Sequence, residues 1–172
     1  MIQFTVYGVA APKGNKSAFP VRRKAGGLGV AVKEGKSERF ADWRRRVEEV
    51  VQTKAREGVP MHDGPLAVRL QFYLPRPQSE PKTRRTWPVR KPDLDKLCRG
   101  VLDCLSGVLI ADDARVIELW LRKDFAAASA DPRPRVEVLV DRWGGGEKGE
   151  EPGPQAFGIR VEESRAGSLR AD

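Results

Sequence analysis

Histidine and cysteine are scarce in this chain of 172 residues, which contains one histidine and two cysteines. Cys98 and Cys104 are six residues apart on one expected helix, which turns them toward different faces and argues against a disulfide within that element. His62 stands in a turn-like MHDGP segment, where we expect it at the surface. These three residues cannot form a usual zinc site, and no P-loop is present, so neither chemistry is supported.

Long apolar runs are also missing. No run approaches the roughly 18 apolar residues that a membrane-spanning helix needs. The N-terminal segment MIQFTVYG has no basic region followed by a long apolar stretch, as a signal peptide would. Together with the two unpaired cysteines, these absences lead us to expect a cytoplasmic protein.

Acidic residues are in the minority, and the formal net charge is +8. Residues 144–172 hold four Lys or Arg and six Asp or Glu, so residues 1–143 hold 28 basic and 18 acidic side chains and carry +10. A basic domain favours polyanionic partners such as nucleic acid, although anionic membranes and acidic proteins would also be attracted. Charge alone therefore suggests a partner but no chemistry.

The apolar pattern predicts an α/β fold, namely a small mixed β-sheet with two main helices. Alternating apolar residues indicate strands over about residues 1–9, 66–74, 115–125 and 135–141. Helical spacing indicates two helices, one from Ser37 to Gly58 and one over about 93–106 that stops at Gly107. We expect one domain over residues 1–143 and a Gly/Pro-rich, flexible and mostly disordered tail over 144–172.

Two loops concentrate basic residues. Residues 10–36 are rich in glycine and read as a mobile basic loop or loose hairpin, and residues 75–91 are held extended by four prolines. Phosphate contact and plain solvation are equally compatible with these charges. The residues that we expect to contact nucleic acid are Lys13, Lys16, Arg22, Arg23, Arg84, Arg85, Arg90, Lys91 and Lys96.

Two acidic pairs flank the second helix, Asp93 with Asp95 at its start and Asp112 with Asp113 after its end. The helix would separate the pairs by roughly 17 Å at 1.5 Å per residue. If residues 107–112 ran back along the helix, the pairs would meet, and the strand from Arg115 would lie antiparallel to the strand 66–74. Both basic loops would then leave the sheet beside the carboxylates, which suit Mg²⁺ or Mn²⁺ held against a phosphate.

Each of these residues also has a purely structural interpretation. Asp93 could cap the helix, and Asp112 with Asp113 could form only a turn entering a strand. Arg99 could aim at a phosphate or form an i,i+4 ion pair with Asp95 or Asp103. The order of an acidic pair, a basic residue, an apolar helix, a glycine and a second acidic pair is far more specific than its parts.

The segment from Lys91 to Val116 resembles the signature of the RusA family of Holliday junction resolvases, which prophages often encode. The family pattern reads approximately D-L-D-N-L-x-K, then L-D-A-L, then D-D-A-Q-V, and this chain has PDLDKLCRG, VLDCL and DDARV. Coarser similarity extends over about residues 1–141. The chain departs from the pattern at Lys96, where Asn is frequent, and at Arg99, where the family has lysine.

The resemblance implies that Asp93, Asp95 and Asp113 are metal-binding catalytic acids, with Asp112 their neighbour and Arg99 at the essential basic position. It also implies a homodimer that nicks opposing strands of a four-way DNA junction with Mg²⁺ or Mn²⁺. Arginine keeps the charge of the family lysine but cannot shuttle a proton near neutral pH. We therefore predict a structure-selective endodeoxyribonuclease of DNA recombination and repair.

Two other functions remain open from the sequence. The chain could be a non-catalytic basic DNA-binding protein of the same fold, whose aspartates only cap and pair. It could also be an interaction protein whose basic surface binds an acidic partner. In the first case Asp113→Asn would leave activity and metal affinity unchanged, and in the second binding would survive nuclease treatment.

Overall fold

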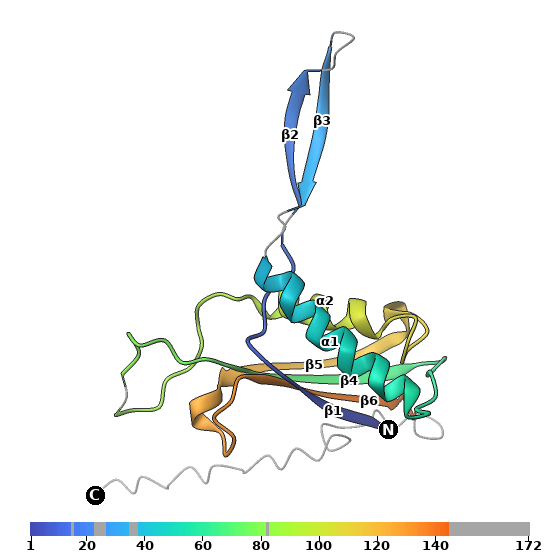
Figure 1. Cartoon of the computed structure of the whole chain (residues 1–172), viewed down its shortest axis with the longest axis vertical. Coiled ribbons are helices and arrows are strands. Elements are labelled where there is room, and N and C mark those ends of the chain that lie inside the picture. The colour runs from blue at the N-terminus through green and yellow to red at the C-terminus, as the bar shows by residue number, and fades with distance from the viewer. Residues whose placement is uncertain (15, 23–26, 35–37, 82, 145–172) are drawn as a thin grey trace, which may run out of the picture.

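The computed structural model describes residues 1–14, 16–22, 27–34, 38–81 and 83–144 (Figure 1). The tail predicted from residue 144 onward lies outside these ranges except for its first residue. The main sheet contains β1 (Ile2–Tyr7), β4 (Leu66–Leu74), β5 (Val116–Phe125) and β6 (Arg135–Arg142), in the order β1-β6-β4-β5. Within the described ranges, the prediction of an α/β fold with a mixed β-sheet and two main helices is confirmed.

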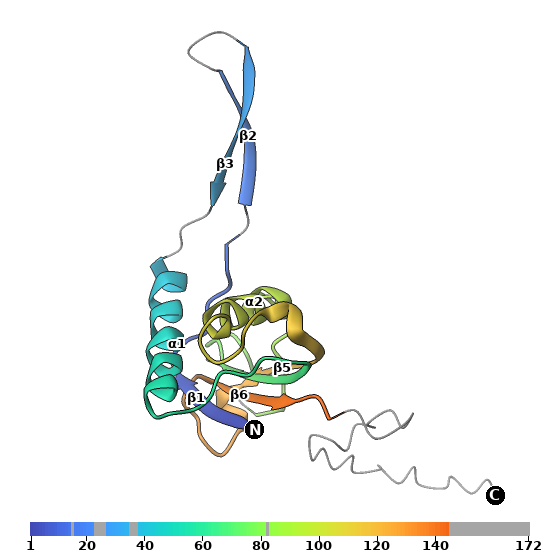
Figure 2. The same ribbon diagram turned by 90° about the vertical axis from the view of Figure 1, so that its right-hand side faces the viewer.

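The two helices cover one face of this sheet. The helices α1 (Glu38–Arg56) and α2 (Leu94–Leu105) lie side by side above the strands in Figures 1 and 2. In β4, alternate residues from Leu66 to Leu74 are buried under the helices, whereas Arg69, Gln71 and Tyr73 are only partly buried. This alternation is what a sheet with one covered face requires.

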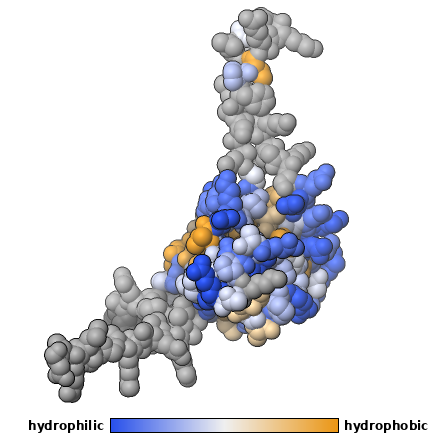
Figure 3. Space-filling model, turned by 90° about the vertical axis from the view of Figure 1, so that its left-hand side faces the viewer, coloured by the Kyte–Doolittle hydropathy of each residue, from blue (hydrophilic) through white to orange (hydrophobic). Residues whose placement is uncertain are grey.

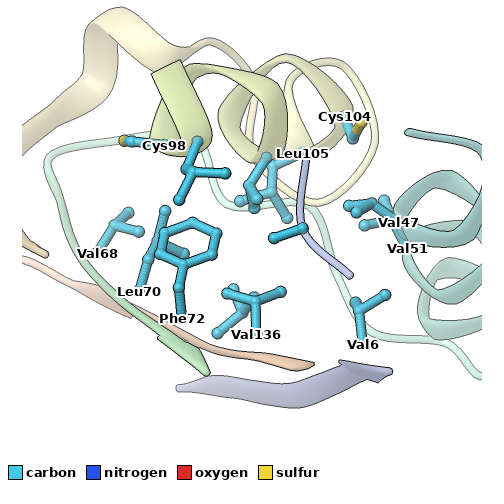
Figure 4. Close-up of a cluster of buried hydrophobic side chains, with 14 of the residues drawn as sticks. Val6, Val47, Val51, Val68, Leu70, Phe72, Cys98, Cys104, Leu105 and Val136 are labelled. Atoms are coloured by element: carbon cyan, nitrogen blue, oxygen red, sulfur yellow. The ribbon is translucent and has the colours of Figure 1, made fainter. Parts of the chain in front are cut away.

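The core lies between the helices and the sheet. Val47 and Val51 of α1 pack with Leu105 of α2 over Phe72 of β4 in one buried cluster (Figure 4). Gly58 and Gly107 follow the two helices with φ angles of +85° and +76°, a backbone conformation that glycine adopts without steric cost. Both helices therefore end just before the glycines that we predicted would terminate them.

The pairing direction of β5 differs from our prediction. β5 runs parallel to β4, with Val116 beside Leu66 and Phe125 beside Leu74, so the predicted antiparallel arrangement is wrong. The reason is that α2 crosses the sheet and carries the chain back to the edge where β4 begins, which is the connection that parallel strands need.

The segment after α2 also takes a different course. Gly107 donates its N–H to the carbonyl of Ile110 at 2.8 Å, which closes a tight turn rather than an extended return along the helix. His62 then pairs with this segment through both backbone groups, donating to Leu109 at 2.8 Å and accepting from Ala111 at 2.9 Å. These contacts direct the following residues into β5 beside the start of β4.

The predicted orientation of β1 and β4 is confirmed, because both are antiparallel to β6 and hence parallel to each other. Tyr7 near the end of β1 and Tyr73 near the end of β4 flank the same residue of β6, Arg135. The two basic loops therefore leave the sheet at the same edge. The first loop contains a separate antiparallel hairpin, β2 (Lys16–Arg22) with β3 (Leu28–Glu34), which projects from the domain.

Candidate active site

The first acidic pair is positioned by the N-terminus of α2. Asp93 is the residue before the helix, but its side chain makes no capping hydrogen bond. Its carboxylate instead forms an ion pair with Lys96, with Oδ2 and Nζ 2.9 Å apart. Lys96, followed by Lys91 and Lys123, lowers the pKa of Asp93. Asp93 therefore remains ionised well below neutral pH, while one of its oxygens is already engaged.

Asp95 and Arg99 lie exposed on α2, one turn apart. Within the described part of the chain, neither side chain has a hydrogen bond or an ion pair. The i,i+4 pair considered from the sequence is not formed, and Asp103 bonds to Lys13 instead. An ion pair at this spacing would stabilise the helix. Leaving Asp95 and Arg99 unpaired therefore does not add to the stability of the fold.

The second acidic pair belongs to a short 3-10 helix, η1 (Asp113–Arg115), which contacts α2. Asp112 caps this turn, and its Oδ1 accepts a hydrogen bond from the Ala114 N–H at 2.7 Å. Asp113 is exposed, and its carboxylate has no hydrogen bond or ion pair among the described residues, although its backbone carbonyl accepts from the Val116 N–H. The structural interpretation of a capped turn therefore holds for Asp112 but does not account for Asp113.

Cys98 connects the two acidic pairs electrostatically. The pKa of this thiol is raised to about 11, chiefly by burial, with Asp95 and Asp113 raising it as well and Arg99 opposing them. Cys98 is buried on α2 and lies at the edge of the hydrophobic cluster (Figure 4). Both carboxylates therefore act on one thiol, although they enter the structure from different elements.

The carboxylates fit an oxygen-liganded divalent ion in their chemistry but are not gathered into a cage. No three His, Cys, Asp or Glu side chains among the described residues are close enough to form a metal site. The expected meeting of all four aspartates is therefore not found among the described residues. Mg²⁺ commonly binds through one or two carboxylates, with waters and substrate phosphates completing its octahedron. Asp95 and Asp113 have both carboxylate oxygens free of hydrogen bonds and ion pairs there, and Asp93 and Asp112 retain one oxygen each.

The predicted nucleic-acid contacts separate into two groups. Lys13, Lys96 and Arg85 are engaged in ion pairs with Asp103, Asp93 and Asp124. The exposed side chains that have no such partner in the described structure are Arg84, Arg90 and Lys91. Arg23 lies outside the described residues, as do the side chains of Lys16 and Arg22.

Two residues of β5 organise the edge near Asp93, and sequence reasoning missed both. Lys123 donates from Nζ to the carbonyls of Arg90 and Pro92 at 2.9 and 3.0 Å. Asp124 is buried and accepts from Arg85. A Lys-Asp dipeptide at the end of a strand is ordinary, so only the three-dimensional contacts reveal that it fastens the second basic loop.

His62 is buried, which corrects the surface position expected from its turn-like segment. Its side chain is 6% exposed, and neither ring nitrogen has a hydrogen-bond partner in the described part of the molecule. Burial lowers its pKa, so the imidazole is neutral near pH 7. Its location beside Leu109 and Ile110 gives it a packing role away from the acidic residues of α2.

The comparisons with known proteins identify the family of this chain. The family model for endodeoxyribonuclease RusA matches residues 18–141, which include Asp93, Asp95, Arg99, Asp112 and Asp113. The chain belongs to the RusA endodeoxyribonuclease family. This result confirms the family that the segment from Lys91 to Val116 indicated. No helix in the described ranges is long and apolar enough to cross a membrane.

A curated relative is the uncharacterized protein YqaN of Bacillus subtilis (strain 168). It is 29% identical to this RusA family member over 86 residues, which correspond to 45% of this chain and 57% of the relative. The match therefore spans less than two thirds of that protein's length.

Proposed function

We propose that this RusA family member is a Mg²⁺-dependent endodeoxyribonuclease that resolves Holliday junctions by paired, symmetric nicks as a homodimer. Mn²⁺ is the alternative ion. Such an enzyme would serve DNA recombination and repair in the cytoplasm. The observation that supports this proposal most is the pair of exposed carboxylates, Asp95 and Asp113, that have no hydrogen bond or ion pair within the described structure.

Asp95 and Asp113 would hold the divalent ion, with Asp93 and Asp112 contributing their unengaged oxygens. When bound, the ion supplies charge neutralisation at the scissile phosphate and activates water for attack. The ion pair with Lys96 keeps Asp93 ionised over the working pH range. Four carboxylates without an ion would repel a phosphodiester, so the acidic residues alone do not favour the substrate.

Arg99 would supply the fixed positive charge. Its guanidinium follows Asp95 by one helical turn and is committed to no carboxylate in the described residues. A charged group aimed at the phosphate stabilises the negative charge that develops as the bond breaks. Because arginine stays protonated, Arg99 can stabilise this charge but cannot deliver the proton to the leaving group.

The exposed cations of the second basic loop would hold the DNA backbone. Arg84, Arg90 and Lys91 have no ion pair in the described structure, so DNA phosphates would break none on binding them, although Lys91 acts on Asp93 at longer range. Each phosphate contact releases condensed cations from DNA, and binding should therefore weaken steeply with salt. A two-fold symmetric dimer would match the two-fold symmetry of a four-way junction.

The decisive experiment compares a synthetic four-way junction with a matched linear duplex, in Mg²⁺ or EDTA, using the wild type, Asp113→Asn and Asp42→Asn. We expect paired symmetric nicks in the junction alone, lost in EDTA and reduced by on the order of a hundredfold or more in Asp113→Asn. Asp42 is an exposed carboxylate on α1 that pairs with Arg45, so its variant should cut normally.

The thermal midpoint of Asp113→Asn should equal that of the wild type, because no bond is lost. Junction binding without nicks in the wild type would contradict the enzyme and support the non-catalytic DNA-binding protein. Equal cutting by Asp113→Asn would remove this residue from the site.

A further inference from the structure

Two large apolar side chains are exposed near the end of the second basic loop. Trp87 is 53% exposed and Val89 is 84% exposed, although most large apolar residues of the domain are buried. The face of the molecule in Figure 3 shows apolar patches among largely hydrophilic surface. Exposing a tryptophan and a valine so close together has a cost in water, which a binding partner would remove.

The residue between them is the anchor of this pair. Pro88 is buried and lines a small apolar cavity together with Leu74 and Phe125, the last residues of β4 and β5. The Val89 N–H donates to the Trp87 carbonyl at 2.8 Å across the proline. We call Trp87 and Val89 the apolar tip, since both are exposed while the proline between them is buried, although Val89 also borders the cavity.

The loop that carries the apolar tip is fastened on both sides. Before the tip, the Arg76 guanidinium donates to the carbonyls of Pro81 and Arg84 and to Thr86 Oγ1. After it, Lys123 donates to the carbonyls of Arg90 and Pro92. These hydrogen bonds fix the loop on both sides of the tip, so less conformational entropy is lost when the tip binds a partner.

The Trp87 ring is itself held in place. The Arg85 guanidinium lies 4.1 Å from the ring centroid, and Arg85 is fixed in turn by the buried carboxylate of Asp124. A cation on one face of an indole leaves the remaining exposed surface for a second flat group. A ring oriented in advance in this way is suited to stacking.

The charges around the apolar tip narrow the choice of partner. Arg84, Arg90 and Lys91 have exposed side chains that are unpaired in the described structure, and the tip precedes Asp93 by only a few residues. A second copy of the same tip would bring like charges together, whereas DNA offers both phosphates and flat base faces. Base faces are covered in a continuous duplex and become accessible where strands exchange.

We propose that the apolar tip stacks on nucleobases exposed at the branch point of a DNA junction, with Trp87 as the stacking surface and Val89 as the adjacent wedge. This inference rests on the proposed function for the identity of the substrate. The tip would thereby distinguish branched from linear DNA, while the cations around it bind both. Stacking depends on the π-face of a base, so the contact requires no particular sequence.

The test uses the full-length protein in EDTA, so that no strand is cut, and a four-way junction with 2-aminopurine at the branch point. Wild type, Trp87→Ala, Trp87→Phe and Arg90→Gln are titrated against this junction and against a duplex carrying the same label. We expect Trp87→Ala to bind the junction about tenfold more weakly, with duplex affinity unchanged and the change in 2-aminopurine fluorescence lost.

The control variants separate stacking from charge. Trp87→Phe keeps a ring and should retain most of the junction preference, whereas Arg90→Gln should weaken junction and duplex binding alike. An unchanged fluorescence response and junction affinity in Trp87→Ala would overturn the proposal. So would a change in its oligomeric state on gel filtration, because that result would make the tip a protein interface.

The outcome can be told apart from that of the proposed function. A wild type that cuts junctions in Mg²⁺ with the same preference as Trp87→Ala would refute the stacking role and leave the nuclease intact. A wild type that never cuts, yet loses junction preference in Trp87→Ala, would support the stacking role in a non-catalytic protein.

Discussion

The two helices of this domain use their surface charges in different ways. On α1, two ion pairs join residues one turn apart, Arg44 with Glu48 at 2.7 Å and Arg45 with Asp42 at 3.1 Å. On α2, Asp95 and Arg99 have the same spacing as Arg44 and Glu48 but form no such pair. Both helices bury an apolar stripe against the same core, so packing does not explain the difference.

The difference indicates which charges are free for a ligand. An exposed pair stabilises a helix by only about 0.3 kcal/mol, so leaving one unformed is a small loss. A carboxylate or guanidinium that is already paired, however, must lose its partner before it binds an ion or a phosphate. The paired charges of α1 therefore contribute to solubility, whereas Asp95 and Arg99 of α2 can bind a ligand without first losing a partner.

The sharpest way to test this distinction is to neutralise two aspartates of α2, one without an ion pair and one with an ion-pair partner. Asp95→Asn removes a free carboxylate and should reduce junction cleavage on the order of a hundredfold or more, with an unchanged thermal midpoint. Asp103→Asn removes the partner of Lys13 and should destabilise the fold by about 1 kcal/mol while cleavage persists. Cleavage rates and urea unfolding measure the two effects.

The opposite pattern would contradict the distinction between the two aspartates. If Asp95→Asn lowered stability and Asp103→Asn abolished cleavage, the paired aspartate would be the functional one. Equal effects of both variants would mean that pairing in the free protein does not indicate function on this helix.

The two arginines offer the next comparison, with a smaller expected effect. Arg99→Gln should lower the cleavage rate by on the order of a hundredfold, because a charge directed at the phosphate is lost. Arg44→Gln breaks the pair with Glu48 and should cost about 0.3 kcal/mol of unfolding free energy with no change in cleavage.

Arg99→Lys serves as the control for charge. A cleavage rate restored close to that of the wild type would support a charge role for this position. A loss as large as that of Arg99→Gln would require the planar guanidinium itself. An active Arg99→Gln variant would remove Arg99 from the site.

The sequence predicted the elements better than their arrangement. Strict alternation from Leu66 to Leu74 and the glycines after both helices carry local information, and these elements formed where expected. The direction of β5 depended on the turn at Gly107 and on pairing with His62, which lies far away in the chain. No local pattern shows that a histidine in a polar turn will be buried.

The candidate site shows the same limit. The spacing of the acidic pairs identified Asp93, Asp95, Asp112 and Asp113 as a group, but it did not show which carboxylates would be engaged. Asp103 forms an ion pair with Lys13, which is 90 positions away in the sequence, and Arg85 forms one with Asp124, which is 39 positions away. Such pairs form only after folding brings distant segments together, so a sequence pattern cannot distinguish free charges from paired ones.

The smallest expected effect concerns the two buried thiols, which report on different carboxylates. The pKa of Cys98 and that of Cys104 are each raised to about 11, chiefly by burial, with Asp95 and Asp113 contributing to the first value and Glu48 and Asp103 to the second. Neutralising Asp95 and Asp113 together should therefore lower the pKa of Cys98 and leave that of Cys104 unchanged. The two pKa values can be measured separately from the ultraviolet absorbance of each thiolate, in chains where the other cysteine is replaced by alanine.

The raised thiol pKa also fixes the direction of the pH dependence. An unfolded thiol ionises near pH 8.5, so the folded state holds the proton more tightly, and this contribution to stability is complete below that pH. It is lost as the pH rises toward 11, and replacing Cys98 with alanine should flatten the fall in unfolding free energy. If neutralising both carboxylates left the Cys98 titration unchanged, Asp95 and Asp113 would not face the same side of α2, and their joint role in holding one ion would be lost.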